Sequence, residues 1–145
     1  MAKTRVLVLC TGNSARSQMG EGLFRAEGGD GYEVFSAGTR PGIVRLEAIA
    51  AMKEIGIDIS SHRSKSVDEF AGQTFDYVVT VCDNARYSCP VFPATERIHW
   101  SLEDPAAVEG SEAERMGAFR QVRNQIHERV KALFANFKSS ENAAS

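Results

Sequence analysis

The chain has 145 residues, of which 43% are hydrophobic and 25% are charged, and this composition is typical of one globular domain with a single core. Its formal net charge of −2 provides no basic surface for nucleic acid or an anionic membrane. Because no apolar run is long enough to span a membrane, and the run behind Lys3 and Arg5 is too short for a secretory signal, we expect a cytosolic protein that binds neither nucleic acid nor membrane.

The predicted elements alternate between strands and helices. Short apolar runs predict strands over residues 4–9, 32–36, 75–81 and 97–100. Apolar residues three or four positions apart predict helices over residues 18–27 and 44–55, a helical turn over 67–71 and a long last helix over 116–137. The polar residues 138–145 are expected to form a frayed tail.

This alternation predicts an α/β fold in one domain over residues 1–137, with a four-stranded parallel sheet and helices on both faces. Right-handed crossovers favour the strand order 2-1-3-4. Ligands of such sheets bind beyond the carboxyl ends of the strands. Cys10 follows the first predicted strand and Cys82 follows the third, so both thiols are expected at this edge.

The sequence CTGNSARS follows the first strand and suits an oxyanion. Successive backbone N–H groups and a helix N-terminus can surround an anion, and the guanidinium of Arg16 can bind two of its oxygens. The same positive field is expected to lower the pKa of the Cys10 thiol, to whose sulfur Ser17 could donate a hydrogen bond. The candidate oxyanion-binding residues are Thr11, Gly12, Asn13, Ser14, Ala15, Arg16 and Ser17.

The spacing of Cys10 and Arg16 is not specific by itself, because an arginine follows a cysteine at a fixed distance roughly once in sixteen by composition. The alternative is a buried structural cysteine beside a solvated arginine. The surrounding strand, small polar loop and helix favour a nucleophile. Asp104 precedes Pro105 in SLEDPA, and a loop aspartate before proline is usually a turn or cap residue.

On CTGNSARS and Asp104-Pro105, the chain resembles the low-molecular-weight protein tyrosine phosphatase superfamily over nearly its whole length. The resemblance implies a four-stranded parallel sheet with a nucleophilic cysteine, here Cys10, at the start of a phosphate-binding loop. It also implies that Asp104 is the general acid that protonates the leaving oxygen, a role that requires a raised pKa.

Two further thiols, Cys82 and Cys89, lie in VCDNARYSCP, and their spacing does not suggest zinc. Either could be a small core residue. However, neighbouring strands lie about 4.8 Å apart, within the roughly 4.4–6.8 Å that a disulfide spans between Cα atoms. Cys82 is therefore expected to approach Cys10 if the first and third strands are neighbours, which favours redox chemistry.

The three cysteines are similar in position to those of the thioredoxin-coupled arsenate reductases, which share the phosphatase fold. This resemblance implies reduction of arsenate, for which phosphate or sulfate is an analogue. It implies a relay in which Cys10 attacks arsenic, Cys82 forms a disulfide with Cys10, and Cys89 then forms one with Cys82. A thioredoxin-like protein would reduce the final disulfide.

Some of these reductases hold a potassium ion, and the matching ligands here are Asn13, Glu21 and Ser36. The position of a fourth ligand, an aspartate, holds Lys65, whose ammonium has no acceptor atom for a cation. We therefore expect no metal and no cofactor. Lys65 either replaces the ion beside Glu21 or is a solvated surface residue, and the three histidines, His62, His99 and His127, form no ligand set.

Two other functions stay open. A tyrosine phosphatase would share Cys10, Arg16 and Asp104, but Ala106 and Ala107 stand where such enzymes usually place an aromatic residue. A weak phosphatase side activity would fit either enzyme. A non-enzymatic anion-binding or redox-sensing module is the third candidate. The sequence favours thioredoxin over glutathione with glutaredoxin as the electron donor and leaves both open.

Overall fold

The structure is a computed structural model that describes residues 3–82 and 92–144. Cys89 lies outside the described residues, so its predicted place on an exposed loop stays a prediction. The α-helices and strands in chain order are β1 (Thr4–Cys10), α1 (Arg16–Gly28), β2 (Tyr32–Gly38), α2 (Leu46–Lys53), β3 (Phe75–Thr80), β4 (Ala94–His99) and α4 (Glu112–Ala144), with short 3₁₀ helices η1 (Gly29–Gly31), η2 (Val67–Phe70) and η3 (Pro105–Ala107).

The four strands form one parallel sheet in the order β2-β1-β3-β4, which confirms the predicted fold class and strand order. Strand β1 lies inside the sheet, where it pairs Leu9 with Ala37 of β2 and with Thr80 of β3. A strand buried on both faces must be apolar throughout. That requirement explains the unbroken run from Val6 to Leu9, which is 0–1% exposed.

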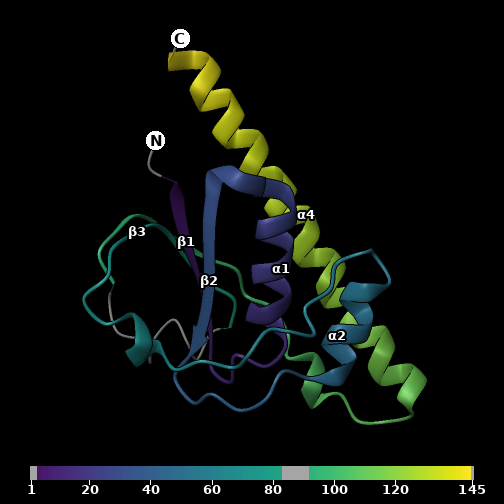
Figure 1. The fold of residues 1–145 in the computed structure, drawn as a ribbon. Coiled ribbons are helices and arrows are strands. Elements are labelled where there is room, and N and C mark those ends of the chain that lie inside the picture. Colours follow the sequence, from purple (N-terminus) through teal and green to yellow (C-terminus); the bar gives the residue numbers. More distant parts are fainter. Residues whose placement is uncertain (1–2, 83–91, 145) are drawn as a thin grey trace.

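The two faces of the sheet are covered differently. Val6 and Val8 pack with buried residues of α1, α2 and α4 in the larger core cluster, and these three helices lie on one side of the sheet (Figure 1). Leu7 and Leu9 belong to a smaller cluster on the other face, which η2 and a group of phenylalanine rings cover. Because side chains alternate along a strand, one apolar run supplies both clusters.

Helix α4 is longer than its apolar spacing predicts. The spacing ends at residue 137, but the helix continues through residues 138–144, where no proline or glycine ends it. The helical backbone of this segment differs from the expected tail, and its fraying in solution stays a prediction. In Figure 1 this end of α4 projects past the sheet. None of the described helices is both long and apolar enough to cross a membrane.

Helix α2 is shorter than predicted at both ends, because residues 44 and 45 are not helical and the helix ends at Lys53 rather than at residue 55. Arg45 is extended, with φ −67° and ψ 136°, and its N–H donates to the Ser14 carbonyl at 2.9 Å. The segment before α2 is thus hydrogen-bonded to the loop that follows β1. Sequence periodicity has no signal for such a long-range backbone contact.

Candidate active site

The loop after β1 turns sharply to place Cys10 and α1 side by side. Cys10 ends β1 at 2% exposure, and Arg16 begins α1. Asn13 has φ 48°, a left-handed conformation that asparagine adopts more readily than most residues. With this turn, the Asn13 N–H points back and donates to the Cys10 sulfur at 3.2 Å.

The sulfur of Cys10 also contacts the hydroxyl of Ser17, at 2.8 Å between Sγ and Oγ. The Asn13 side-chain amide donates to the same hydroxyl oxygen at 2.7 Å. The bond from Asn13 leaves the hydrogen of the Ser17 hydroxyl available to the sulfur, and a thiolate at Cys10 can only accept it. The predicted contact between Ser17 and Cys10 is therefore present, and Asn13 supports it.

The expected lowering of the Cys10 pKa is wrong for this structure. Burial raises the pKa of the Cys10 thiol above its ordinary value, although the hydrogen bonds of Ser17 and the charge of Arg16 oppose this effect. Burial prevails because it removes water from the thiolate, whereas Arg16 directs its guanidinium to another loop. A charge on Cys82 would raise the Cys10 pKa further.

Asn13 is the centre of a buried hydrogen-bond network and is itself 0% exposed. Its Nδ2 donates to Ser17 and, at 2.9 Å, to Ser36. Its Oδ1 accepts from Nε2 of Gln18 and from the N–H of Lys65, both at 2.9 Å. All hydrogen-bonding atoms of this amide thus have partners, which fixes the loop in one conformation.

Gly38, at the end of β2, permits the closest backbone approach in the site. A Cβ atom there would overlap the carbonyl oxygen of Thr11 and lie 2.9 Å from the nitrogen of Asn13. The next residues extend the contact, since the N–H groups of Arg40 and Gly42 donate to the Thr11 and Gly12 carbonyls at 2.9 and 3.2 Å. A residue without a side chain is therefore required at position 38.

Arg16 lies close to Asp104, although the two residues are 88 positions apart in the chain. The Arg16 guanidinium donates to the Leu102 carbonyl at 2.9 Å and lies 3.9 Å from Oδ2 of Asp104. The Asp104 side chain is 45% exposed, and its Oδ1 caps η3 by accepting from the Ala106 N–H at 3.0 Å. Asp104 is both a cap residue and a neighbour of Arg16. Capping η3 is therefore compatible with the general-acid role that the resemblance implies.

Cys82 lies beside the same loop. The N–H of Val81 donates to the Leu9 carbonyl, so the pairing of β3 with β1 continues to Val81, the residue before Cys82. The Cys82 sulfur lies 3.4 Å from the Thr11 hydroxyl. Cys10 and Cys82 are both buried, so the adjacent strand ends bring two cysteine sulfurs to one edge of the sheet.

Comparison with known proteins agrees with this arrangement. The sequence profile of the family described as low molecular weight phosphotyrosine protein phosphatase matches residues 5–143. The chain belongs to this family. It is 46% identical over 134 residues to an arsenate reductase of Halalkalibacterium halodurans, a match that covers 92% of this chain and 96% of the relative.

Two solved structures of family relatives are also similar. One is described as an arsenate reductase in the phosphate binding state, with a TM-score of 0.77 and 34% identity over 92% of this chain and 98% of the other. The second, a thioredoxin-dependent arsenate reductase of Corynebacterium glutamicum, has a TM-score of 0.73 and 26% identity over 95% of this chain and 63% of the other.

In this chain, three basic side chains surround the carboxylate of Glu21. Glu21 is 2% exposed, and its carboxylate lies 3.0 Å from Arg25, 3.2 Å from His62 and 3.6 Å from Lys65. Burial lowers the pKa values of His62 and Lys65, and the charge of Glu21 opposes both shifts. The expected proximity of Lys65 to Glu21 is confirmed, whereas its replacement of an ion stays a prediction.

Lys65 also donates to the Arg63 carbonyl at 3.0 Å, so its ammonium lies among oxygen atoms as a bound cation would. Ser36 donates to Glu21 at 2.8 Å, which links this region to Asn13. Among the described residues, no group of three or more His, Cys, Asp or Glu side chains is placed to hold a metal ion.

Sequence reasoning missed three residues that shape the loop: Gly38, Gln18 and Ser64. Gln18 bridges Asn13 to the Arg63 carbonyl, and Ser64 donates to the Gly12 carbonyl at 2.8 Å. A glycine directly after the second predicted strand could have suggested a close approach at the carboxyl edge. Gln18 and Ser64 carry no comparable signal, since their partners lie 45 and 52 positions away.

Proposed function

We propose that this protein reduces arsenate to arsenite through a relay of thiols. One observation carries this proposal: a second cysteine, Cys82, lies against Thr11 of the oxyanion loop that begins after Cys10. Hydrolysis of a phosphate ester needs one nucleophilic cysteine, whereas reduction of arsenate needs a second sulfur that can close a disulfide. The arsenate reductases among its relatives support the same choice.

In the first step, the Cys10 thiolate attacks arsenic(V), and an arsenate oxygen that already carries one proton takes a second from Asp104 and leaves as water. Residues 11–17 hold the remaining oxygens through backbone N–H groups, and the Arg16 guanidinium turns from Leu102 to bind two of them. Ser17 and the Asn13 N–H stabilise negative charge on the sulfur as the proton leaves, because both already contact it.

In the second step, Cys82 attacks the Cys10 sulfur. The sulfur–arsenic bond breaks, its electron pair stays on arsenic, and arsenite leaves as arsenic(III) with a Cys10–Cys82 disulfide behind it. Cys89 then attacks Cys82, which frees Cys10 and leaves Cys82–Cys89. A dithiol reductant such as thioredoxin supplies two electrons and two protons to restore the enzyme. The cytosol, where such reductants are kept reduced, is the proposed location.

The test is arsenate-dependent oxidation of NADPH by the purified protein with thioredoxin and thioredoxin reductase, repeated with glutathione, glutaredoxin and glutathione reductase. We expect turnover with thioredoxin, no turnover with phosphate in place of arsenate, and much slower turnover in the glutathione system. Absence of arsenate-dependent oxidation with either donor would refute the proposal.

Phosphatase activity on phosphotyrosine is the second candidate, because Cys10, Arg16 and Asp104 would serve both reactions. The segment after Asp104 contains Pro105, Ala106 and Ala107, which form η3 and provide no aromatic ring to pack against a substrate ring. A phosphatase would hydrolyse phosphotyrosine rapidly and would not need Cys82. A protein that binds arsenate without turnover would instead support the anion-binding or redox-sensing module.

A further inference from the structure

The segment that contacts the catalytic loop carries apolar and basic side chains, which we call the docking patch: Arg40, Ile43 and Leu46, which are exposed, and Arg45, which is half-buried. Ile43 and Leu46 are 76% and 78% exposed, and the next large apolar side chain that is exposed in the described residues, Ile55, is 36% exposed. Large apolar side chains this exposed beside a reactive site are typical of interaction surfaces.

Backbone hydrogen bonds fix the docking patch to the catalytic loop. The N–H groups of Arg40 and Arg45 donate to the carbonyls of Thr11 and Ser14, both at 2.9 Å. Between them, the N–H of Gly42 donates to the Ser64 hydroxyl at 3.0 Å. The backbone of the patch is therefore joined to the loop that begins after Cys10 at the carboxyl edge of the sheet.

The charge of the docking patch is positive, although the whole chain has a net charge of −2. Residues 39–46 include two arginines and no acidic residue, and within the described part of the chain neither guanidinium has an ion pair or hydrogen bond. The nearest acid along the chain, Glu47, is already paired with Arg115 at 2.7 Å. The patch is thus suited to a partner with acidic side chains.

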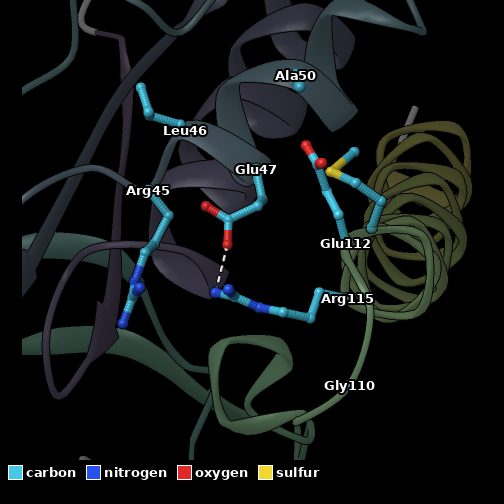
Figure 2. Close-up of a pocket in the computed structure, with 8 residues that line it drawn as sticks. Arg45, Leu46, Glu47, Ala50, Gly110, Glu112 and Arg115 are labelled. Carbon is cyan, nitrogen blue, oxygen red and sulfur yellow. Dashed lines mark hydrogen bonds and ion pairs between the residues drawn. The ribbon is translucent and has the colours of Figure 1, made fainter.

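A pocket adjoins the docking patch and can receive a side chain of the partner. It has a volume of about 630 Å³ and lies between the first turns of α2 and α4, with Arg45 and Leu46 among its lining residues. Figure 2 shows Arg115 crossing the pocket from α4 to Glu47, while the guanidinium of Arg45 points away from that pair. Arg45 is therefore available to a carboxylate at the edge of the pocket.

We propose that the docking patch binds the protein dithiol that reduces the enzyme, an inference that rests on the proposed reductase function. The partner is a small protein whose attacking cysteine lies in an apolar surface with acidic side chains at its rim. Its first sulfur attacks the enzyme disulfide to form a mixed disulfide, and its second thiol closes its own disulfide, so two electrons and two protons pass to the enzyme. A small thiol such as glutathione does not need two exposed aliphatic side chains for binding.

The test measures kcat/KM for thioredoxin in Ile43→Ser, Leu46→Ser and the double variant Arg40→Glu/Arg45→Glu. We expect each apolar substitution to lower kcat/KM by about tenfold or more. The charge reversal should lower it most at low ionic strength, and added salt should reduce the difference from the parent. Ile55→Ser is the matched control and should keep the parent value.

Two further measurements distinguish a loss of thioredoxin docking from a loss of enzyme activity. Reduction of the oxidised variants by dithiothreitol, and the arsenite released in one turnover without thioredoxin, should both equal the parent values, since neither needs docking. Parent-like kcat/KM for thioredoxin in all three variants would overturn the inference. It would also be overturned if the parent were a dimer that Leu46→Ser dissociates without any change in that kcat/KM, because the patch would then bind a second copy. Failure of the parent to release arsenite would refute the reductase function instead.

Discussion

Replacing Ser17 by alanine tests how the protein makes Cys10 reactive despite burying it. The Ser17 hydroxyl lies 2.8 Å from the Cys10 sulfur, and its hydrogen bond is the largest of the effects that lower the pKa of this thiol against the rise caused by burial. A hydrogen bond to a charged group contributes about 1.5–3 kcal/mol. Ser17→Ala should therefore reduce the thiolate population at neutral pH by about tenfold to a hundredfold, since about 1.4 kcal/mol is a factor of ten.

The assay is the rate at which iodoacetamide alkylates Cys10 between pH 6 and 10, followed by mass spectrometry in a Cys82→Ser/Cys89→Ser background. The pKa of Cys10, which is already above its ordinary value, should rise further in Ser17→Ala, so alkylation should slow across this pH range as the rate profile moves to higher pH. Ser14→Ala, a change in the same loop with no described contact to the sulfur, is the control.

An unchanged pH profile in Ser17→Ala would refute the assignment of this hydroxyl as a donor to the thiolate. A profile that moves equally in Ser17→Ala and Ser14→Ala would show a general effect of the loop instead. Urea denaturation of both variants would detect a loss of fold, which would expose the buried Cys10 and speed its alkylation instead of slowing it.

Three other substitutions test the loop and its surroundings. Asn13→Ala should lower the free energy of unfolding by about 3 kcal/mol because it removes buried hydrogen bonds, and Asn13→Gly should recover about 1 kcal/mol since glycine adopts the left-handed φ without cost; equal urea midpoints would contradict this. Gly38→Ala should cost about 1–3 kcal/mol and weaken protection of Cys10 by sulfate against alkylation, because its Cβ overlaps the Thr11 carbonyl. Lys65→Asp should create a rise in melting temperature with potassium over sodium that the parent lacks, and a potassium-specific rise in the parent would exclude an ammonium in the cation position.

The sequence predicted the fold well where apolar spacing reports burial. The run from Val6 to Leu9 predicted a strand buried on both faces, and the alternation of elements predicted the parallel order β2-β1-β3-β4. The same periodicity placed Cys10 and Cys82 at one edge. These features depend on local pattern and on chain topology, both of which a single sequence contains.

Features that depend on contacts between distant segments could not be predicted. The Leu102 carbonyl accepts from Arg16 across 86 positions, and no residue type signals a backbone acceptor. The Cys10 pKa was predicted in the wrong direction because the loop suggested positive charge, whereas the extent of burial appears only in the folded chain. The start of α2 was misplaced because Arg45 donates its N–H to Ser14 rather than within a helix.

Disulfide mapping after a single turnover with arsenate tests the proposed relay most directly. The parent protein should release one arsenite and show Cys82–Cys89 on peptide mass mapping, and Cys89→Ser should release one arsenite and stop with Cys10–Cys82. Cys82→Ser should release none, although its oxyanion loop is intact and slow hydrolysis of an aryl phosphate survives. Continuous turnover of Cys89→Ser with thioredoxin, or arsenite release by Cys82→Ser, would contradict the relay.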